Sequence, residues 1–164
     1  MTAAPLALRV GVGYDSHRFA PGGPLVLGGV ALPGEQHLHG HSDGDAIAHA
    51  VTDAILGAAA LGDIGAMFAD TDPANRGRDS IEMLALATAR LHAHGWAVGQ
   101  VDVVVVAEAP KIAPHRQAMA ARLAAALTIA EQDVSIKGKT NEGMGWIGRR
   151  EGIACMATAT IVRR

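Results

Sequence analysis

The sequence has few cysteines, few aromatic residues and no excess of positive charge. Cys155 is the one cysteine among 164 residues, so no disulfide can form within the chain, which is typical of a reducing compartment. The formal net charge is −2, and a broad basic surface for duplex nucleic acid is therefore not expected. No apolar run approaches the ~20 residues of a membrane-spanning helix, and the segment before Arg9 is too short and too uncharged for a signal or transit peptide. We expect a cytoplasmic protein that binds neither nucleic acid nor membrane.

Aromatic residues make up 3% of the chain, whereas hydrophobic residues make up 49%. The core must therefore be packed from alanine, valine, leucine and isoleucine. A chain of this length can bury one good core, and we expect a single domain over residues 1–164. Alanine-rich helices bury little area per residue, which makes association between copies of the chain a reasonable source of further burial.

Strands are expected where β-branched and apolar residues alternate or run together. These ranges are 8–14, 25–32, 101–106, 134–137 and 153–162. The range 101–106 is apolar almost throughout, which indicates a strand covered on both faces. A turn at Pro21-Gly22-Gly23-Pro24 separates the first two strands.

Helices are predicted over residues 45–61, 80–94 and 114–127, where apolar residues recur at helical spacing. Asp43 or Ser42 can cap the start of the first helix, and Gly95 is a natural terminator of the second. Together with the strands, these helices predict an α+β fold, with three helices packed on one side of a sheet of four or more strands.

Two short polar clusters introduce metal-ligand chemistry into this apolar chain. Asp15 and His17 lie in or just after the first predicted strand, where residues two apart share a face. The second cluster, residues 41–45, leads into His49 on the first predicted helix. One strand and one helix could therefore supply a carboxylate and two imidazoles to one cation. Three protein ligands leave a coordination position open, which is the pattern of a catalytic rather than a structural zinc site.

These clusters belong to a longer series of polar motifs that runs from about Arg9 to the C-terminus. They are Gly13-Tyr14-Asp15-Ser16-His17-Arg18, His41-Ser42-Asp43-Gly44-Asp45, His49, Leu61-Gly62-Asp63-Ile64-Gly65, Asp70-Thr71-Asp72-Pro73, Ala109-Pro110-Lys111, Lys139-Thr140-Asn141-Glu142 and Arg149-Arg150-Glu151-Gly152. Taken together, this series closely resembles the 2-C-methyl-D-erythritol 2,4-cyclodiphosphate synthase family.

The resemblance implies an activity and an assembly. Members of that family cyclise 4-diphosphocytidyl-2-C-methyl-D-erythritol 2-phosphate and release CMP, in the non-mevalonate route to isoprenoid precursors. They are homotrimers with active sites between neighbouring subunits. The resemblance therefore implies a phosphorus–oxygen lyase that acts on a small cytidine diphosphate substrate.

The resemblance also implies the cofactors and the residues that act on the reacting phosphates. Asp15, His17 and His49 would bind one Zn²⁺ per subunit, and Glu142 would help to bind a second divalent cation, Mg²⁺ or Mn²⁺. Hard oxygen ligands suit the second ion, while two imidazoles favour zinc at the first site. His41 and Thr140 match the positions that stabilise the transition state by hydrogen bonds to phosphate oxygens.

Residues that would contact the substrate match four segments of the family pattern. They are Asp15, Ser16, His17, His41 and Ser42 beside the zinc and the 2-phosphate; Asp63, Ile64, Gly65, Phe68, Ala69, Asp70, Thr71 and Asp72 around the methylerythritol; Ala107, Glu108, Ala109, Pro110, Lys111, Ile112 and Ala113 around the cytidine; and Lys139, Thr140, Asn141, Glu142, Trp146 and Arg149. The ranges 107–113 and 139–142 would face a neighbouring subunit's zinc, and Trp146 and Arg149 match further substrate-contact positions. Trp146 stands where many members have phenylalanine, and Lys139 replaces a threonine that is common in some.

Several other polar residues have simpler interpretations. Asp45 and Asp53 fit a helix cap and partners that orient a ligand histidine better than they fit metal ligands. The other histidines, His37, His39, His92, His94 and His115, are interpreted as loop or surface residues. Cys155 is expected to be an inert strand thiol.

Two other function classes compete with the synthase. The run from His39 to Asp43 has the H-x-H-x-D pattern of metallo-β-lactamase-like hydrolases, but Gly44 stands where that run needs another histidine. A non-catalytic metal-binding trimer is the second alternative, supported by four histidines between His37 and His49. The products would distinguish the three classes. The synthase should release CMP and a cyclic product with no free inorganic phosphate, whereas a hydrolase would open rather than cyclise the substrate and a scaffold would do neither.

Overall fold

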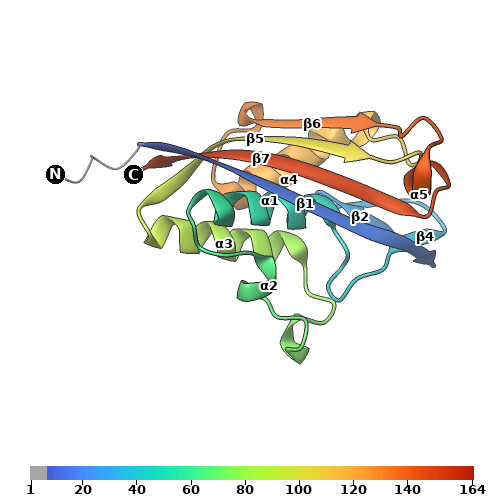
Figure 1. Ribbon diagram of the computed structural model, residues 1–164, viewed down its shortest axis with the longest axis horizontal. Helices are drawn as coiled ribbons and strands as arrows, with labels where there is room; N and C mark the ends of the chain where they lie inside the picture. The colour runs from blue at the N-terminus through green and yellow to red at the C-terminus, as the bar shows by residue number, and fades with distance from the viewer. Residues whose placement is uncertain (1–6) are drawn as a thin grey trace.

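The computed structural model describes residues 7–164, in which a main sheet carries helices on one of its faces and a smaller sheet is separate from it (Figure 1). Its elements are β1 (Leu8–Pro21), β2 (Leu25–Leu27), β3 (Val30–Leu32), β4 (Gln36–Leu38), α1 (Ala46–Ala58), α2 (Ile64–Met67), η1 (Pro73–Asn75), α3 (Ser80–Ala93), β5 (Trp96–Val106), η2 (Ala113–His115), α4 (Arg116–Leu127), η3 (Glu131–Asp133), β6 (Val134–Lys139), α5 (Gly145–Gly148) and β7 (Gly152–Arg163). Among these residues, no helix is long and apolar enough to cross a membrane.

The main sheet has five strands in the order β4-β1-β7-β5-β6. All neighbours are antiparallel except β5 and β6, which run parallel. Helix α1 packs against β1 and β7, α4 packs against β6, and α3 lies against both helices. The core lies between this helical layer and the sheet. The predicted α+β fold, with helices on one side of the sheet, is confirmed.

The first two predicted strands differ from the prediction in length and number. The strand predicted over 8–14 continues to Pro21, so Asp15 and His17 lie within regular β structure. The range 25–32 is two short strands, β2 and β3, which form a separate two-stranded sheet. Gly28 and Gly29 turn the chain between them with φ of 56° and 71°, a backbone region that favours glycine. Strand β4 was not predicted.

The helix boundaries also differ at their starts. The first helix begins at Ala46, and Asp45 caps it, instead of Asp43 or Ser42. The range 114–127 begins as the short helix η2 and becomes α-helical at Arg116. The second helix was predicted well, since α3 spans Ser80–Ala93 and Gly95 follows it with φ of 76°.

Strand β5 is longer than predicted, and its burial in the single chain alternates from residue to residue. One face points into the core, while the other face of the sheet is covered by no element of residues 7–164 (Figure 1). The prediction that residues 101–106 are covered on both faces is therefore not met within one chain.

Glycines on β1 bring α1 unusually close to the sheet. A Cβ atom on Gly13 would overlap the carbonyl oxygen of Ala50, and one on Gly11 would overlap that of Ala54. Successive residues of β1 face opposite sides of the sheet. The residues two apart that face the helix are Gly11, Gly13, Asp15 and His17. The same close approach therefore brings the next turn of α1 against Asp15 and His17.

Candidate metal centre and active site

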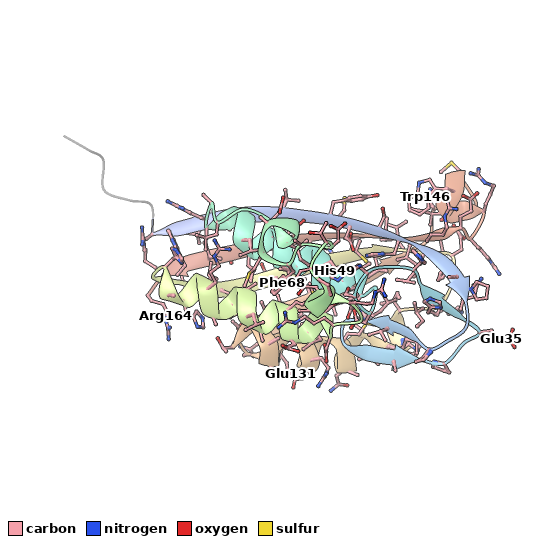
Figure 2. The ribbon with its side chains drawn as sticks, turned by 90° about the horizontal axis from the view of Figure 1, so that it is seen from below. Glu35, His49, Phe68, Glu131, Trp146 and Arg164 are labelled. Atoms are coloured by element: carbon pink, nitrogen blue, oxygen red, sulfur yellow. The ribbon has the colours of Figure 1, made fainter. Side chains whose placement is uncertain are left out.

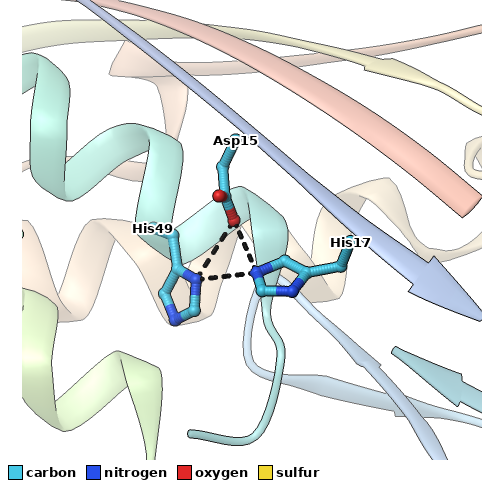
Figure 3. Close-up of side chains that lie close together, drawn as sticks. All are labelled: Asp15, His17 and His49. Carbon is cyan, nitrogen blue, oxygen red and sulfur yellow. Dashed lines mark hydrogen bonds and ion pairs between the residues drawn. The ribbon is translucent and has the colours of Figure 1, made fainter. Parts of the chain in front are cut away.

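Asp15 and His17 from β1 meet His49 from α1 at one point (Figure 3). The Asp15 Oδ2 atom lies 2.8 Å from His17 Nε2 and 3.1 Å from His49 Nδ1. The two ring nitrogens are 3.2 Å apart. Among residues 7–164, these three form the one group of at least three potential metal ligands.

The backbone determines which nitrogen of His17 faces the group. His17 Nδ1 lies 2.8 Å from the carbonyl oxygen of His39, which can only accept a hydrogen bond. Nδ1 therefore carries a proton, and a neutral His17 presents the lone pair of Nε2 to Asp15 and His49. The His39 side chain was interpreted as a loop or surface group, but the backbone carbonyl of this residue orients His17.

Asp15 and His17 stabilise each other's charged forms. Burial raises the pKa of Asp15, but hydrogen bonds from His17 and His49 and their charges outweigh it, so the pKa of that carboxyl is lowered. Burial lowers the pKa of His17, but the hydrogen bond and charge of Asp15 outweigh it, so the pKa of that imidazole is raised. The group holds a carboxylate beside two imidazoles, which is a donor set that suits zinc.

Asp45 fixes the start of the helix that carries His49. It is completely buried, and its carboxylate accepts from the N–H groups of Ile47 and Ala48 at 3.1 Å each. It also accepts from Gly28 at 2.8 Å and Gly29 at 2.7 Å, at the turn between β2 and β3. Burial raises the pKa of Asp45 despite these hydrogen bonds. A helix cap was one of the roles predicted for Asp45, and this role is confirmed; Asp45 also joins α1 to that turn.

Asp53 has a different role from the one predicted. Its Oδ1 atom accepts from the N–H of Ile64 at 2.7 Å. Burial raises the pKa of Asp53, although that hydrogen bond opposes the shift. Asp53 thus holds the start of α2 in the pocket segment, and no hydrogen bond joins it to a ligand histidine in the described chain.

A cavity of ≈ 330 Å³ opens at the three candidate ligands. Phe68 lies beside His49 at this cavity (Figure 2). The lining residues are Asp15, His17, His41, Ser42, His49, Ile64, Gly65, Phe68, Ala69, Asp70, Asn75 and Met83. Most of the predicted zinc-side and methylerythritol-side residues therefore share one cavity.

Four residues predicted for the same region do not line that cavity. Asp63 and Asp72 instead cap α2 and η1, accepting from Ala66 at 2.7 Å and from Ala74 at 3.0 Å. Thr71 is exposed beside them. Ser16 lines a separate cavity of ≈ 210 Å³ with Trp146.

The residues predicted for the nucleotide side form a second group where β5 and β6 end. The Ala107 N–H donates to the Lys139 carbonyl at 2.8 Å. Glu108 Oε1 accepts from the N–H of Asn141 at 2.9 Å. In the described chain, none of the ranges 107–113 and 139–142 lines the cavity around His49. Within one chain, the predicted site is thus in two parts.

Thr140, Glu142 and Arg149 are exposed on this second part. Thr140 Oγ1 donates to Glu142 Oε1 at 3.3 Å, and Glu142 has a positive φ of 52°. Arg149 Nε donates to Glu151 Oε1 at 2.7 Å. Glu142 lies outside the group of three candidate ligands.

Sequence reasoning missed Ser80 and the contacts that join it to Asp43. Ser80 is fully buried, and its Oγ lies 2.8 Å from His49 Nε2. Asn75 and Met83 were also missed as lining residues. Ser80 and His49 are 31 residues apart, and Ser80 begins a helix, where serine has an ordinary structural explanation.

Comparison with known proteins places this geometry in a family. The sequence model of the YgbB family matches residues 8–162. The chain belongs to the YgbB family. Relatives that carry the name 2-C-methyl-D-erythritol 2,4-cyclodiphosphate synthase include those of Gemmatimonas aurantiaca, 63% identical over 96% of this chain and 95% of the relative, and of Bordetella petrii, 54% identical over 94% and 96%. The resemblance drawn from the motifs is confirmed.

Solved structures named IspF and IspDF have the same fold. The IspF of Plasmodium falciparum, solved as a CDP complex, matches with a TM-score of 0.85 and 33% identity over 98% of this chain and 99% of that one. The bifunctional IspDF of Campylobacter jejuni matches with a TM-score of 0.92 and 38% identity over 96% of this chain. This chain spans 42% of that longer protein.

Proposed function

We propose that this protein is a 2-C-methyl-D-erythritol 2,4-cyclodiphosphate synthase that cyclises 4-diphosphocytidyl-2-C-methyl-D-erythritol 2-phosphate and releases CMP. The observation that carries the proposal is the meeting of Asp15, His17 and His49 at the mouth of a cavity, in a chain whose relatives carry that name. The reaction belongs to the non-mevalonate route to isoprenoid precursors. It makes the protein a phosphorus–oxygen lyase.

The chemistry needs positioning more than it needs a base. An oxygen of the 2-phosphate, which is already anionic, forms a bond to the β-phosphorus. The bond from that phosphorus to the bridging oxygen breaks, and CMP leaves with the oxygen and its electron pair. The barrier lies in holding two anionic groups together and in line. When bound, Zn²⁺ would withdraw charge from the phosphate oxygens, and Mg²⁺ or Mn²⁺ would offset the charge of the departing CMP.

The chain's own residues hold the substrate around this step. Asp15, His17 and His49 hold the zinc, and Glu142 contributes to the site of the second cation. Ser42 holds the 2-phosphate. His41 and Thr140 donate hydrogen bonds to phosphate oxygens as charge moves onto them. His41 and Ser42 line the same cavity as the candidate ligands, which supports these roles.

The methylerythritol and the cytidine occupy different parts of the site. Ile64, Gly65, Phe68, Ala69 and Asp70 line the sugar side, and the lining of the cavity supports this assignment. Ser16, Asp63, Thr71 and Asp72 do not line this cavity, and their contacts with the substrate stay predictions. The ranges 107–113 and 139–142, with Trp146 and Arg149, form the cytidine side.

The active form that we propose is a homotrimer. The uncovered face of the sheet carries apolar side chains, including Val12, Val10 and Tyr14, which are 69%, 64% and 56% exposed in the single chain. Met156 pairs with Tyr14 across β1 and β7, and Val162 pairs with Leu8, so these residues share that face. An apolar strip of this kind is typical of a surface that another copy covers.

The trimer also explains why the predicted site is in two parts. In a closed ring, each interface joins two different surfaces of the chain, so one subunit's zinc side can face its neighbour's nucleotide side. The whole range 1–164 acts as one catalytic domain in this proposal. The protein works in the cytoplasm on a small molecule, and neither nucleic acid nor a membrane takes part.

Substitution of His49 tests the metal-dependent part of the proposal. His49→Ala leaves two ligands, so zinc should be lost and turnover abolished, while alanine keeps the helix. His115→Ala, a histidine outside the cavity, is the matched control and should keep both zinc and turnover. Zinc content, circular dichroism and the yield of CMP are measured. A His49→Ala variant with full zinc and full activity would remove His49 from the site.

A further inference from the structure

Ser80 and Asp43 lie behind His49, away from the other candidate ligands. His49 Nδ1 faces Asp15 and His17, whereas Nε2 lies 2.8 Å from Ser80 Oγ. Ser80 is fully buried at the start of α3 and contacts Asp43 twice. Its N–H donates to Asp43 Oδ2 at 3.0 Å, and its hydroxyl donates to Asp43 Oδ1.

The available protons determine which atoms donate and which accept in the hydrogen bonds between Asp43, Ser80 and His49. A carboxylate can only accept hydrogen bonds, and a serine hydroxyl has one proton. Because Ser80 gives that proton to Asp43, its oxygen can only accept from His49. In a neutral His49, Nε2 must then carry the single ring proton, and Nδ1 is left with a lone pair directed at Asp15 and His17.

We propose that Asp43 and Ser80 are positioning residues that hold the His49 proton on Nε2 and so keep Nδ1 available as a metal ligand. This inference rests on the proposed metal site. His17 is fixed in the complementary way, because the His39 carbonyl holds its proton on Nδ1. In their neutral forms, both imidazoles therefore present an unprotonated nitrogen to one point. Partners of this kind orient a ligand histidine and raise its basicity.

Ser42 is a less suitable partner for His49 than Ser80. Ser42 Oγ lies 3.0 Å from Nε2 and 3.3 Å from Ser80 Oγ. Among the contacts of the described chain, no carboxylate accepts the Ser42 hydroxyl proton, so this hydroxyl does not fix the direction of the bond to the ring. Ser42 also lines the cavity, where we place the substrate's 2-phosphate.

Zinc affinity tests the role of Ser80. Ser80→Ala removes the hydroxyl oxygen that accepts the hydrogen bond from His49 Nε2. The zinc dissociation constant should rise about 10- to 100-fold, which is the usual effect of losing a hydrogen-bond partner of a ligand histidine. The matched control is Thr88→Val. Thr88 is 2% exposed in the same helix and donates only to the Leu84 carbonyl, at 2.9 Å. Both variants lose a buried hydroxyl, but Thr88→Val should bind zinc as the parent does. Affinities are measured by competition with a chromophoric chelator.

Asp43→Asn tests the direction of the contacts. If the amide nitrogen of the substituted side chain faces Ser80, that nitrogen donates to the Ser80 hydroxyl. The Ser80 hydroxyl then donates to His49 Nε2, and the ring proton moves to Nδ1. Zinc affinity should therefore fall. Because Asp43 acts on the ring through Ser80, the double variant Asp43→Asn/Ser80→Ala should bind zinc about as Ser80→Ala does. Losses that multiply in the double variant would contradict the proposed connection.

The ring proton can be observed in the zinc-loaded parent protein with ¹⁵N-labelled histidine. We expect an Nε2–H signal of His49 protected from exchange with water, and loss of that protection in Ser80→Ala. A parent protein that binds no zinc would overturn the proposed function. A parent that binds zinc while Ser80→Ala binds it within about twofold, or a His49 ring with its proton on Nδ1, would overturn this inference alone. The position of the ring proton is observed in the parent protein, so this test does not depend on the folding of any variant.

Discussion

At the scale of single residues, a substitution of Glu142 distinguishes the two proposed metal sites, because it should affect the second cation and not the zinc. It lies with Thr140 on the nucleotide side and apart from the three candidate zinc ligands. Glu142→Gln should therefore keep full zinc and lose the response of turnover to added Mg²⁺ or Mn²⁺, because an amide is a poorer ligand for a hard cation. Metal titrations of turnover measure this response.

Glu131 is a suitable control for that substitution. It lies in η3, away from His49 (Figure 2), and Glu131→Gln removes the same charge. The control should show the metal response of the parent protein. An unchanged response in Glu142→Gln would refute the role of Glu142.

Local spacing explains why some site residues could be predicted and others could not. Asp15 and His17 share a strand face because side chains alternate along a strand, and the structure places them so. Ser80 approaches His49 only because α3 packs against α1, which no spacing within the sequence reveals. The assignments of substrate-contact residues stay predictions.

At the scale of elements, the site depends on how closely α1 approaches β1. Gly13→Ala would force the Cβ atom against the Ala50 carbonyl oxygen and move the helix outward. Overpacking of this kind typically costs about 1–3 kcal/mol in the free energy of unfolding. We expect that loss in chemical denaturation, together with weaker zinc binding, because His49 moves with the helix.

Gly57→Ala provides the control on the same helix. Nothing lies within 4 Å of a Cβ built on Gly57, and this glycine is exposed within α1. Alanine should raise the free energy of unfolding by up to ~1 kcal/mol and leave zinc binding unchanged. Equal behaviour of the two variants would show that the close approach at Gly13 does not matter.

Helices and strands in which apolar residues recur at a regular spacing were the easiest to predict. Helix α3 was predicted to within one residue at its end, because apolar residues recur at helical spacing and Gly95 follows. Strand β4 was missed, since three residues carry no usable period. The range 25–32 was interpreted as one strand, because its apolar residues continue on both sides of the turn at Gly28 and Gly29.

At the scale of the whole molecule, the uncovered sheet face should control assembly and activity together. Val12→Glu places a charge in the middle of that face, and burial of an unpaired charge is costly. We expect the trimer to dissociate and turnover to be lost. Zinc should remain bound, because all three candidate ligands come from one chain.

Leu86→Glu is the corresponding change on the helical side. Leu86 is 39% exposed on α3, and we expect its variant to remain trimeric and active. Sedimentation velocity, zinc content and CMP release are measured for both variants. A Val12→Glu protein that is monomeric and fully active would show that each chain carries a complete site.

The central claim is that this protein cyclises its substrate without using water. Turnover of 4-diphosphocytidyl-2-C-methyl-D-erythritol 2-phosphate in H₂¹⁸O, with Zn²⁺ and Mg²⁺ present, tests it through the masses of both products. Cyclisation predicts CMP and a cyclic diphosphate that contain no ¹⁸O, because the attacking oxygen belongs to the substrate's own phosphate. An open-chain bisphosphate, or CMP, that carries one ¹⁸O would show that water is the nucleophile and would contradict the account.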